Sequence, residues 1–598
     1  MSRRIAAAEC FDPEFELVDT GAFAEQRYFD VTIEYAKGGP DDILMRITAK
    51  NRGPDTAPLH LLPQLWARNN WSWSGAIERP LLKAVGPATI EAAHPKFGPM
   101  QLDIDGAPVL LFCENETNGN RLFGFSGSGP FKDGIDSYVV HGDRGAVGAE
   151  GRGTKCAAHF QMELEPGERR TICPAVPLAR LRRPAFRRFR PHLRRPHRGG
   201  RRILRFAAAG HCGPDARLVQ RQALAGMLWS KQFYYFDIPQ WLAGDPTQPT
   251  PPESRRRGRN AAWLHLNNSD IIAMPDKWEY PWYAAWDLAF HCVTFALIDP
   301  EFAKSQLVLM TREWYMHPNG QLPAYEWAFD DVNPPVHAWA SWRVYQMDKA
   351  LKGKGDRAFL EGVFHKLILN FNWWVNRKDM CGRNVFEGGF LGLDNIGLFD
   401  RSAPLPTGGY ISQSDGTAWM AMYALNLMRI ALELAIENHV YEDLATKFFE
   451  HFLYIADAMT RMGGEHGLWD EQDEFFYDVL NLPGDRSIPL RVRSMVGLIP
   501  LYAVEVLQAE IFEQLPAFTA RLRWFLDHRP NLAKLVSRWT QPAQGEVHLL
   551  SLLRGHRMKK LLKTRNAPST RRSSCPTTGF APCLGCMPGR PMSSNVRT

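Results

Sequence analysis

The chain has 598 residues, of which 45% are hydrophobic and 23% charged, and its formal net charge is +7. This much apolar material can bury more than one hydrophobic core, which excludes a disordered protein. The length of the chain and the dispersion of its ten cysteines exclude a small disulfide-stabilised domain. No apolar run reaches the roughly 18 residues of a membrane span and the N-terminus lacks a secretory segment, so the sequence predicts a cytoplasmic protein without a membrane partner.

The first part of the chain has the pattern of antiparallel strands. Residues 28–35 and 43–48 alternate apolar and polar side chains, and Gly, Pro and Asn-Gly turns separate similar runs up to about Leu164. This pattern predicts an antiparallel β-sandwich domain over residues 1–170.

Residues 180–205 contain 12 arginines and no acidic residue. Such a run can be interpreted as a nucleic-acid patch or a localisation signal. Without it the formal charge of the chain would be negative, so the basic character belongs to this tract alone. Ordinary codons for residues 184–205, decoded one base later, permit an acidic amphipathic peptide. We therefore interpret residues 171–215 as a linker in a shifted frame and predict no nucleic-acid partner.

From about Gln220 to Lys563 the pattern becomes helical. Three long segments show helical periodicity, namely 418–437, 441–462 and 492–511. Short loops between consecutive helices favour antiparallel pairs, as in an α/α toroid, although a solenoid or a bundle has the same periodicity. Residues 216–563 are predicted as a helical domain, and residues 564–598, which contain no acidic residue, as an aberrant or disordered tail.

The segment Lys277–His291 crowds Trp and Tyr rings around acidic groups at the start of an apolar helix. A pyranose stacks its C–H face on an aromatic ring, and carboxyl groups hydrolyse its glycosidic bond. The candidates for a sugar site in this segment are Trp278, Glu279, Trp282, Trp286 and Asp287. Packing in a core is the competing interpretation of the tryptophans.

Two later loops carry similar groups. Tyr325, Glu326 and Trp327 follow a Pro- and Gly-containing loop, and Asp394 with Asn395 follow a Gly-rich stretch. Loops on rigid scaffolds carry binding groups more often than cores do, although Asp394 and Asn395 could instead form an Asx turn. The sequence has no phosphate-binding loop, zinc-protease motif or serine-hydrolase elbow, and no cofactor or metal is predicted.

Two motifs resemble those of glycoside hydrolase family 63, which includes bacterial processing α-glucosidases and mannosylglycerate hydrolase-like enzymes. They are Trp286-Asp287-Leu-Ala-Phe290 and Gly392-Leu-Asp394-Asn395. The resemblance runs from about Asp12 to about Lys563, with the arginine tract as an interruption. It implies a six-hairpin (α/α)6 barrel after a β-sandwich, and a hydrolase of carbohydrate metabolism.

The resemblance also implies site roles. Asp287 would be the general acid of an inverting, exo-acting α-glucosidase on a short α-linked oligosaccharide or glycoside, and Asp394 with Asn395 would bind sugar hydroxyls. The family's base is a Glu in a segment without a counterpart before Thr598, and its sandwich begins upstream of Asp12. We therefore expect both domains to be incomplete and this truncated, frameshifted chain to be inactive. The alternative is a non-catalytic carbohydrate-binding remnant, and the oligomeric state is not predicted.

Overall fold

The chain divides into two compact units, a β-rich unit of residues Met1–His211 with Gln240–Pro252 and a mainly helical unit of residues Cys212–Pro239 with Glu253–Thr598. The computed structural model describes residues 16–21, 23–39, 42–73, 77–177, 213–258, 261, 263–274, 283–325, 332–377, 386, 399, 401, 405–461, 467–484, 486–533 and 547–566. Within these ranges, no helix combines the length and the apolar composition that a membrane crossing needs.

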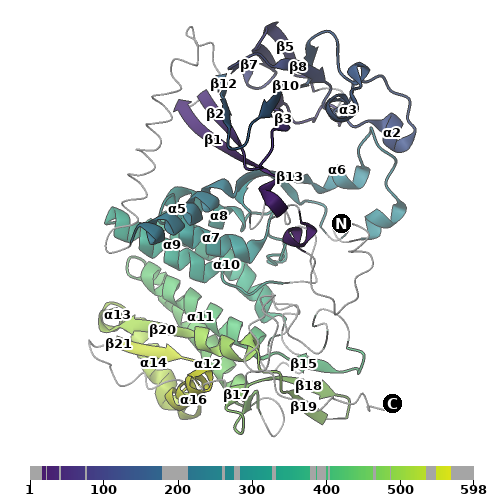
Figure 1. Ribbon diagram of the computed structural model, residues 1–598. Coiled ribbons are helices and arrows are strands. Elements are labelled where there is room, and N and C mark those ends of the chain that lie inside the picture. Colours follow the sequence, from purple (N-terminus) through teal and green to yellow (C-terminus); the bar gives the residue numbers. More distant parts are fainter. Residues whose placement is uncertain are drawn as a thin grey trace. The chain divides into compact units, whose positions relative to one another are not determined.

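The β-rich unit contains two antiparallel sheets (Figure 1). The larger has the strand order β1-β2-β12-β7-β6-β5-β9, and β11 also pairs with β2. Its strands are β1 (Phe29–Gly39), β2 (Asp42–Asn51), β5 (Leu81–Gly86), β6 (Thr89–His94), β7 (Gly98–Ile104), β9 (Arg152–Gly153), β11 (Arg169–Ile172) and β12 (Pro174–Pro177). The smaller sheet contains β3 (Ala57–Leu61), β4 (Gln64–Trp66), β8 (Val109–Cys113) and β10 (Lys155–Leu164). The strands predicted at 28–35 and 43–48 are confirmed as parts of β1 and β2.

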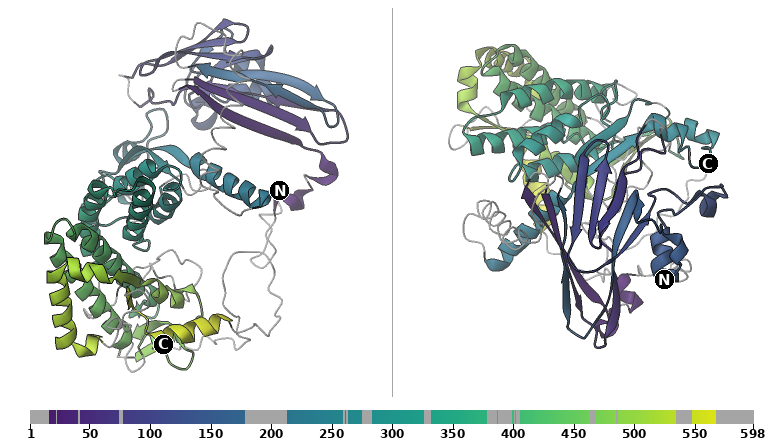
Figure 2. Two further views of the ribbon diagram at one scale, coloured as in Figure 1. Left: turned by 90° about the vertical axis from the view of Figure 1, so that its left-hand side faces the viewer. Right: turned by 90° about the horizontal axis from the view of Figure 1, so that it is seen from above.

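The two sheets share one hydrophobic core, because alternate residues of each strand point to the same face. Ile90 and Leu102 of the larger sheet pack with Phe112 and Cys156 of the smaller one, and Figure 2 shows the layered strands. Short helices α2 (Gly119–Phe123) and α3 (Gly134–His141) and the 3₁₀ turns η1 (Leu17–Thr20), η2 (Ala24–Gln26) and η3 (Arg144–Ala146) complete this unit. The predicted linker, the arginine tract and the tail beyond residue 566 lie outside the described residues.

Three consecutive helical hairpins build most of the second unit (Figure 1). They are α7 (Ala285–Phe295) with α8 (Pro300–Leu309), α9 (His337–Lys352) with α10 (Arg357–Val375), and α11 (Ser414–Ala435) with α12 (Val440–Arg461). Helix α5 (Pro214–Trp229) and the paired strands β13 (Lys231–Asp237) and β14 (Asn267–Ala273) precede them; α6 (Ile238–Ala243) and η4 (Glu253–Arg257) lie between these strands in sequence.

Capping residues explain the tight turns inside the hairpins. The Asp299 side chain accepts a hydrogen bond from the N–H of Phe302 at the start of α8, and Asp356 does the same for Phe359 at the start of α10. Gly353 ends α9 with a left-handed φ of 74°, which glycine adopts without strain. Each hairpin therefore closes within a few residues, which leaves the long connections at the other end.

Helix α9 packs against both α7 and α11, whereas α10 packs against α8. Helices α7, α9 and α11 therefore form one layer and run in the same direction, because an antiparallel partner separates each from the next. This arrangement confirms the prediction of antiparallel helix pairs. It also places the N-termini of α7, α9 and α11 at one end, where the long connections lie.

The prediction of a helix over residues 492–511 is wrong. This segment forms a 3₁₀ helix η5 (Met495–Tyr502), a strand β20 (Val504–Gln508) and the start of α13 (Ala509–Gln514). Pro500 lacks the N–H of a regular helix, and the β-branched Val504 and Val506 alternate in β20, which pairs with β21. The remaining elements are β15 (Tyr410–Ser412), β16 (Trp469–Asp470), β17 (Phe475–Phe476), β18 (Asp478–Leu482), β19 (Arg486–Leu490), α14 (Pro516–His528), α15 (Pro530–Ala533), β21 (Val547–Ser551) and α16 (Gly555–Asn566).

Candidate active site

The start of α7 is held by the long connection that follows α8. The rings of Tyr283 and Tyr315 meet edge to face with centroids 5.4 Å apart. The N–H of Ala285 donates to the carbonyl of Ala324 at 3.0 Å, so this loop satisfies a backbone donor that the first turn of a helix leaves free. The segment before α7 and the loop before α9, which both carry predicted sugar-binding residues, therefore meet at this end of the helices.

The other connections join the same end. The Asn370 amide, near the end of α10, donates to the carbonyl of Gly320 at 2.8 Å. The N–H of Phe386, from the connection between α10 and α11, donates to the hydroxyl of Thr417 in the first turn of α11 at 3.2 Å. The described parts of the connections before α9 and α11 therefore contact the end of the unit at which these helices begin, an arrangement in which loops carry binding groups on a rigid scaffold.

Asp287 lies in the first turn of α7 and is partly buried. Burial raises the pKa of its carboxyl group above the ordinary value, and a hydrogen bond from its own backbone N–H opposes this change. Among the described residues, no ion pair or side-chain hydrogen bond engages Asp287. A carboxyl group whose acid form persists to a higher pH is suited to donate a proton to a leaving oxygen.

A cavity of about 800 Å³ lies in the layer of α7, α9 and α11 and includes Trp286, the residue before Asp287. Its aromatic lining consists of Trp286, Phe290, Trp339, Trp342, Trp419 and Tyr502. Several of these rings contact one another: Trp286 meets Phe290 at 5.8 Å, and Trp419 meets Tyr502 at 5.6 Å between centroids. The cavity has the size of a small-molecule site, and its ring surfaces can stack on the C–H faces of a sugar.

Three buried polar atoms in this lining have no hydrogen-bond partner among the described residues. They are Nε1 of Trp419, Oδ1 of Asn426 and Nη1 of Arg429. Trp419 is 6% exposed and Asn426 is 4% exposed, so neither side chain has ready access to bulk water. Buried polar atoms are nearly always paired in folded proteins, and unpaired ones are costly. The two donors and one acceptor therefore indicate a ligand that both accepts and donates hydrogen bonds, as hydroxyl groups do.

Charged groups lie on another part of the cavity wall. Burial raises the pKa of Glu505, and the positive charges of Arg429 and Arg343 oppose this change. The Arg429 guanidinium lies 5.0 Å from the ring centre of Trp342, a cation–π contact that fixes its position. Glu505 is thus a second carboxyl group of the cavity, one that sequence patterns did not single out.

The predicted site residues are described only in part. Trp286 lines the cavity and Asp287 follows it, while Tyr325 is partly buried at the end of the loop before α9. The other predicted residues, Trp278, Glu279, Trp282, Glu326, Trp327, Asp394 and Asn395, lie outside the described residues and their roles stay predictions. Within the described ranges, no cluster of three or more His, Cys, Asp or Glu side chains is arranged to hold a metal ion.

A buried ion triad supports the start of α11. Arg401 pairs with Asp415 through two contacts of 2.5 and 3.0 Å, and the Asp415 side chain is inaccessible to solvent. Asp478 accepts a hydrogen bond from the N–H of Ser414. Burial raises the pKa of Asp478 to about 6; the charge of Arg401 opposes this change and that of Asp415 adds to it. The triad connects residue 401, at the edge of the loop that carries Asp394, to the start of α11.

The triad predicts a pH dependence of stability. The pKa of Asp478 in the folded protein lies above the value of about 3.9 in an unfolded chain. Its contribution to stability is therefore complete below about pH 4 and is lost as the pH rises through about 6. Asp478→Asn keeps an acceptor for Ser414, so its urea midpoint should fall less between pH 4.5 and 7.5 than that of the wild type. Equal declines in the two proteins would contradict this assignment.

One stretch of the chain matches a known protein family. Residues 280–389 match the mannosylglycerate hydrolase MGH1-like glycoside hydrolase domain. The uncharacterized protein YMR196W of Saccharomyces cerevisiae is 43% identical over 616 residues, which cover 92% of this chain and 56% of that protein. This chain thus spans little more than half the length of its curated relative.

Solved structures show weaker likeness. The GH63 mannosylglycerate hydrolase from Thermus thermophilus in complex with glucose aligns with a TM-score of 0.30 and 16% identity, over 46% of this chain and 74% of that one. A putative kojibiose phosphorylase from the human microbiome aligns with a TM-score of 0.24 and 8% identity, over 75% of this chain and 54% of that one.

The matched segment begins seven residues before Asp287 and includes α7 to α10, so this part of the helical unit is similar to a glycoside hydrolase domain. This match agrees with the family resemblance of the motif Trp286-Asp287-Leu-Ala-Phe290, which lies inside the matched residues.

Proposed function

We propose that this protein is an inverting, exo-acting α-glycosidase for an α-glucoside or a similar short α-linked oligosaccharide, and the hydrolysis assay below decides between activity of this chain and the inactivity expected from its sequence. The observation that carries the proposal is the aromatic cavity that includes Trp286, the residue before Asp287, together with the unpartnered polar atoms of Trp419, Asn426 and Arg429 in its lining. Ring faces and mixed donors and acceptors suit a sugar, and the partly buried carboxyl group suits proton donation.

In this proposal Asp287 protonates the glycosidic oxygen as the bond to the sugar breaks, and a carboxylate across the ring activates water. We assign no base among the described residues. The three hairpins from α7 to α12 would form part of an (α/α)6 barrel, with the sugar in the cavity that Trp286 and Asn426 line. Asp394 and Asn395, in the loop before α11, would hold hydroxyl groups of the cleaved residue.

A second candidate function is sugar binding without hydrolysis. The aromatic lining and the unpartnered polar atoms support it equally, since they can bind a sugar whether or not the site activates water. The two functions share the cavity and differ in turnover. The experiment is therefore to measure calorimetric binding and release of reducing sugar for matched α- and β-linked glucosides. Hydrolysis of the α-linked compounds supports the enzyme, and binding without hydrolysis supports the second function. If the protein neither binds nor hydrolyses these compounds, both functions are contradicted.

We expect replacement of Asn426, whose Oδ1 has no hydrogen-bond partner, to affect the stability of the protein and its affinity for the sugar in opposite ways. Asn426→Leu removes a buried acceptor without a partner and keeps a similar volume, so the free energy of unfolding should stay unchanged or rise. Affinity for the sugar should fall about tenfold, or ~1.4 kcal/mol, because a hydroxyl loses its acceptor. Urea denaturation and calorimetry measure the two effects.

Asn370 provides a matched control on α10. It is also 4% exposed, but its amide donates to Gly320 at 2.8 Å and its oxygen accepts from the Tyr423 hydroxyl at 3.0 Å. Asn370→Leu should therefore destabilise the protein by about 1–3 kcal/mol, since the buried Gly320 carbonyl loses its donor, although the Tyr423 hydroxyl keeps the Leu367 carbonyl as an acceptor. If both variants lost the same stability, Asn426 would be a structural residue and the cavity would lose its main polar argument.

A further inference from the structure

Two arginines line the cavity of the helical unit without a bonded counter-ion. Arg343 lies on α9 and Arg429 lies on α11, and both belong to the cavity lining. Among the described residues, neither guanidinium forms an ion pair or a hydrogen bond. Nη1 of Arg429 is almost inaccessible to solvent, and a buried charged donor without a partner costs more than a neutral one. The cavity therefore holds positive charge that the fold itself does not pair.

The position of Arg429 is set by an aromatic ring. Its guanidinium lies 5.0 Å from the ring centre of Trp342, a contact that holds the group but supplies no acceptor for its N–H donors. A guanidinium presents these donors as a planar fork that matches the oxygens of a carboxylate or a phosphate. Hydrogen bonds to an anionic oxygen are also stronger than those to a hydroxyl group. An anion is thus the partner that suits Arg429 best.

Glu505 of β20 is the carboxyl group of the described lining, and it does not neutralise the two arginines. Within the described residues it forms no ion pair with either of them. Burial raises the pKa of Glu505 even though both positive charges oppose this change, whereas a carboxylate in a close ion pair has a lowered pKa. Two cations consequently face one carboxyl group, and they would balance a dianion when that carboxyl group is protonated.

We propose that the cavity binds a glycoside that carries a phosphate monoester, whose oxygens accept hydrogen bonds from Arg343 and Arg429. This inference rests on the sugar-binding role of the cavity proposed above. A phosphate monoester has a charge of about −1.5 to −2 at neutral pH and three acceptor oxygens, so it can bind two guanidinium groups at once. A carboxylate has one charge and matches a single fork. The sugar would stack on rings such as Trp286 and Trp419.

The test compares three methyl α-glucosides that differ at one carbon: the neutral glucoside, its phosphate ester on the primary hydroxyl, and the glucuronide, which has a carboxylate there. Calorimetry with the whole chain should show that the phosphorylated glucoside binds at least about tenfold more tightly than the neutral one, with the glucuronide between them. This phosphate preference should fall about tenfold in Arg343→Gln and in Arg429→Gln. Arg523→Gln, which changes an exposed arginine of α14 outside the cavity lining, should keep the wild-type preference.

Glu505→Gln provides a variant with the opposite effect. It removes a negative charge beside the anion and keeps the shape of the side chain, so the phosphate preference should rise. A purely structural role of Glu505 would instead lower the affinity for the neutral and the phosphorylated glucoside alike.

Equal affinity for the neutral and the phosphorylated glucoside would overturn the phosphate site and leave the proposed function standing. The proposal would also be wrong if the glucuronide bound as tightly as the phosphate ester, or if both arginine variants kept the wild-type preference. Inorganic phosphate that bound as tightly as the phosphorylated glucoside would overturn it too, because the site would then not recognise the sugar. Failure of all three glucosides to bind would contradict the proposed function together with this inference.

Discussion

Asp287→Asn should abolish hydrolysis of an unactivated α-glucoside and leave sugar binding nearly unchanged. The asparagine has the same shape but cannot give a proton to the leaving oxygen, so the rate should fall at least about 100-fold and up to about 10,000-fold. Because the loss is confined to the transition state, calorimetric affinity for the sugar should persist. Steady-state kinetics with a disaccharide provides the measurement.

The leaving group supplies a sharp control for this prediction. A glucosyl fluoride needs far less protonation of its leaving group, so Asp287→Asn should lose much less activity on it than on the disaccharide. Asp443 is an exposed aspartate in the first turn of α12, and Asp443→Asn should leave both activities at the wild-type level. Equal losses on the two substrates would show that Asp287 has a structural role.

The pH profile follows from the same group. Burial raises the pKa of Asp287, and in the proposed mechanism its protonated form is the active one. The value of kcat/KM for the disaccharide should therefore fall as the pH rises, with the fall above the ordinary carboxyl range of about 4. The fluoride should show a weaker fall on the alkaline side.

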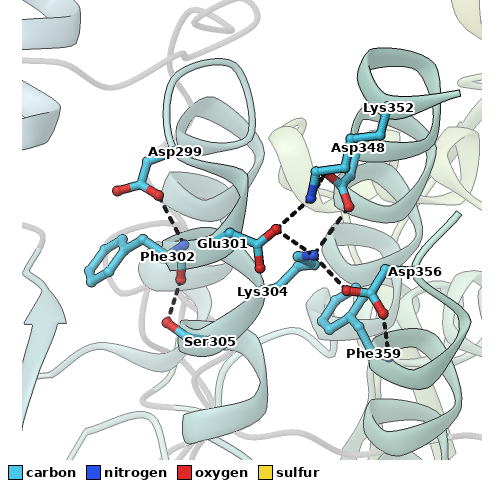
Figure 3. A network of polar contacts seen from close by, with 9 residues as sticks. All are labelled: Asp299, Glu301, Phe302, Lys304, Ser305, Asp348, Lys352, Asp356 and Phe359. Atoms are coloured by element: carbon cyan, nitrogen blue, oxygen red, sulfur yellow. Dashed lines mark hydrogen bonds and ion pairs between the residues drawn. The ribbon is translucent and has the colours of Figure 1, made fainter. Parts of the chain in front are cut away.

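Lys304→Met should produce the largest loss of stability in the helical unit. Figure 3 shows the Lys304 ammonium between helices α8, α9 and α10. It contacts Asp356 at 2.6 Å, Glu301 at 3.0 Å and Asp348 at 3.2 Å, and the Asp348 side chain is fully buried. Burial lowers the pKa of Lys304, but its hydrogen bonds to the three carboxylates outweigh this effect and raise it.

Loss of this ammonium would leave a buried carboxylate cluster with Lys352 as its remaining cation. Breaking a buried ion pair by removing one partner costs about 3–5 kcal/mol, and urea denaturation followed by tryptophan fluorescence should show a loss of this size. The exposed pair of Lys366 with Glu313 is a matched control on α10, and Lys366→Met should cost at most about 1 kcal/mol. Similar losses in the two variants would contradict the role of the Lys304 network.

Local patterns in the sequence predicted the elements whose periodicity is regular. Alternation at 28–35 and 43–48 predicted β1 and β2, and long apolar periodicity predicted α11 and α12. The same criterion predicted a helix over residues 492–511, and this prediction was wrong. Apolar residues on both sides of Pro500 have helical spacing, but the β-branched Val504 and Val506 favour the strand β20.

The polar cavity and the Lys304 network depend on contacts far apart in sequence. Lys304 meets Asp348 and Asp356 across 44 and 52 residues, distances that no local pattern reports. One signal for the cavity was available: Asn426 and Arg429 are three residues apart in the apolar middle part of α11, where a buried polar pair needs a partner. The motif around Asp287 was visible because its chemistry is concentrated in one segment.

The most direct test of the central claim is a ¹H NMR time course of α-glucoside hydrolysis by the purified protein. The account predicts that the β-anomer of the released sugar appears first and that Asp287→Asn abolishes its formation, as an inverting mechanism with this acid requires. First appearance of the α-anomer would contradict inversion. Undiminished hydrolysis by Asp287→Asn would contradict the assignment of the acid.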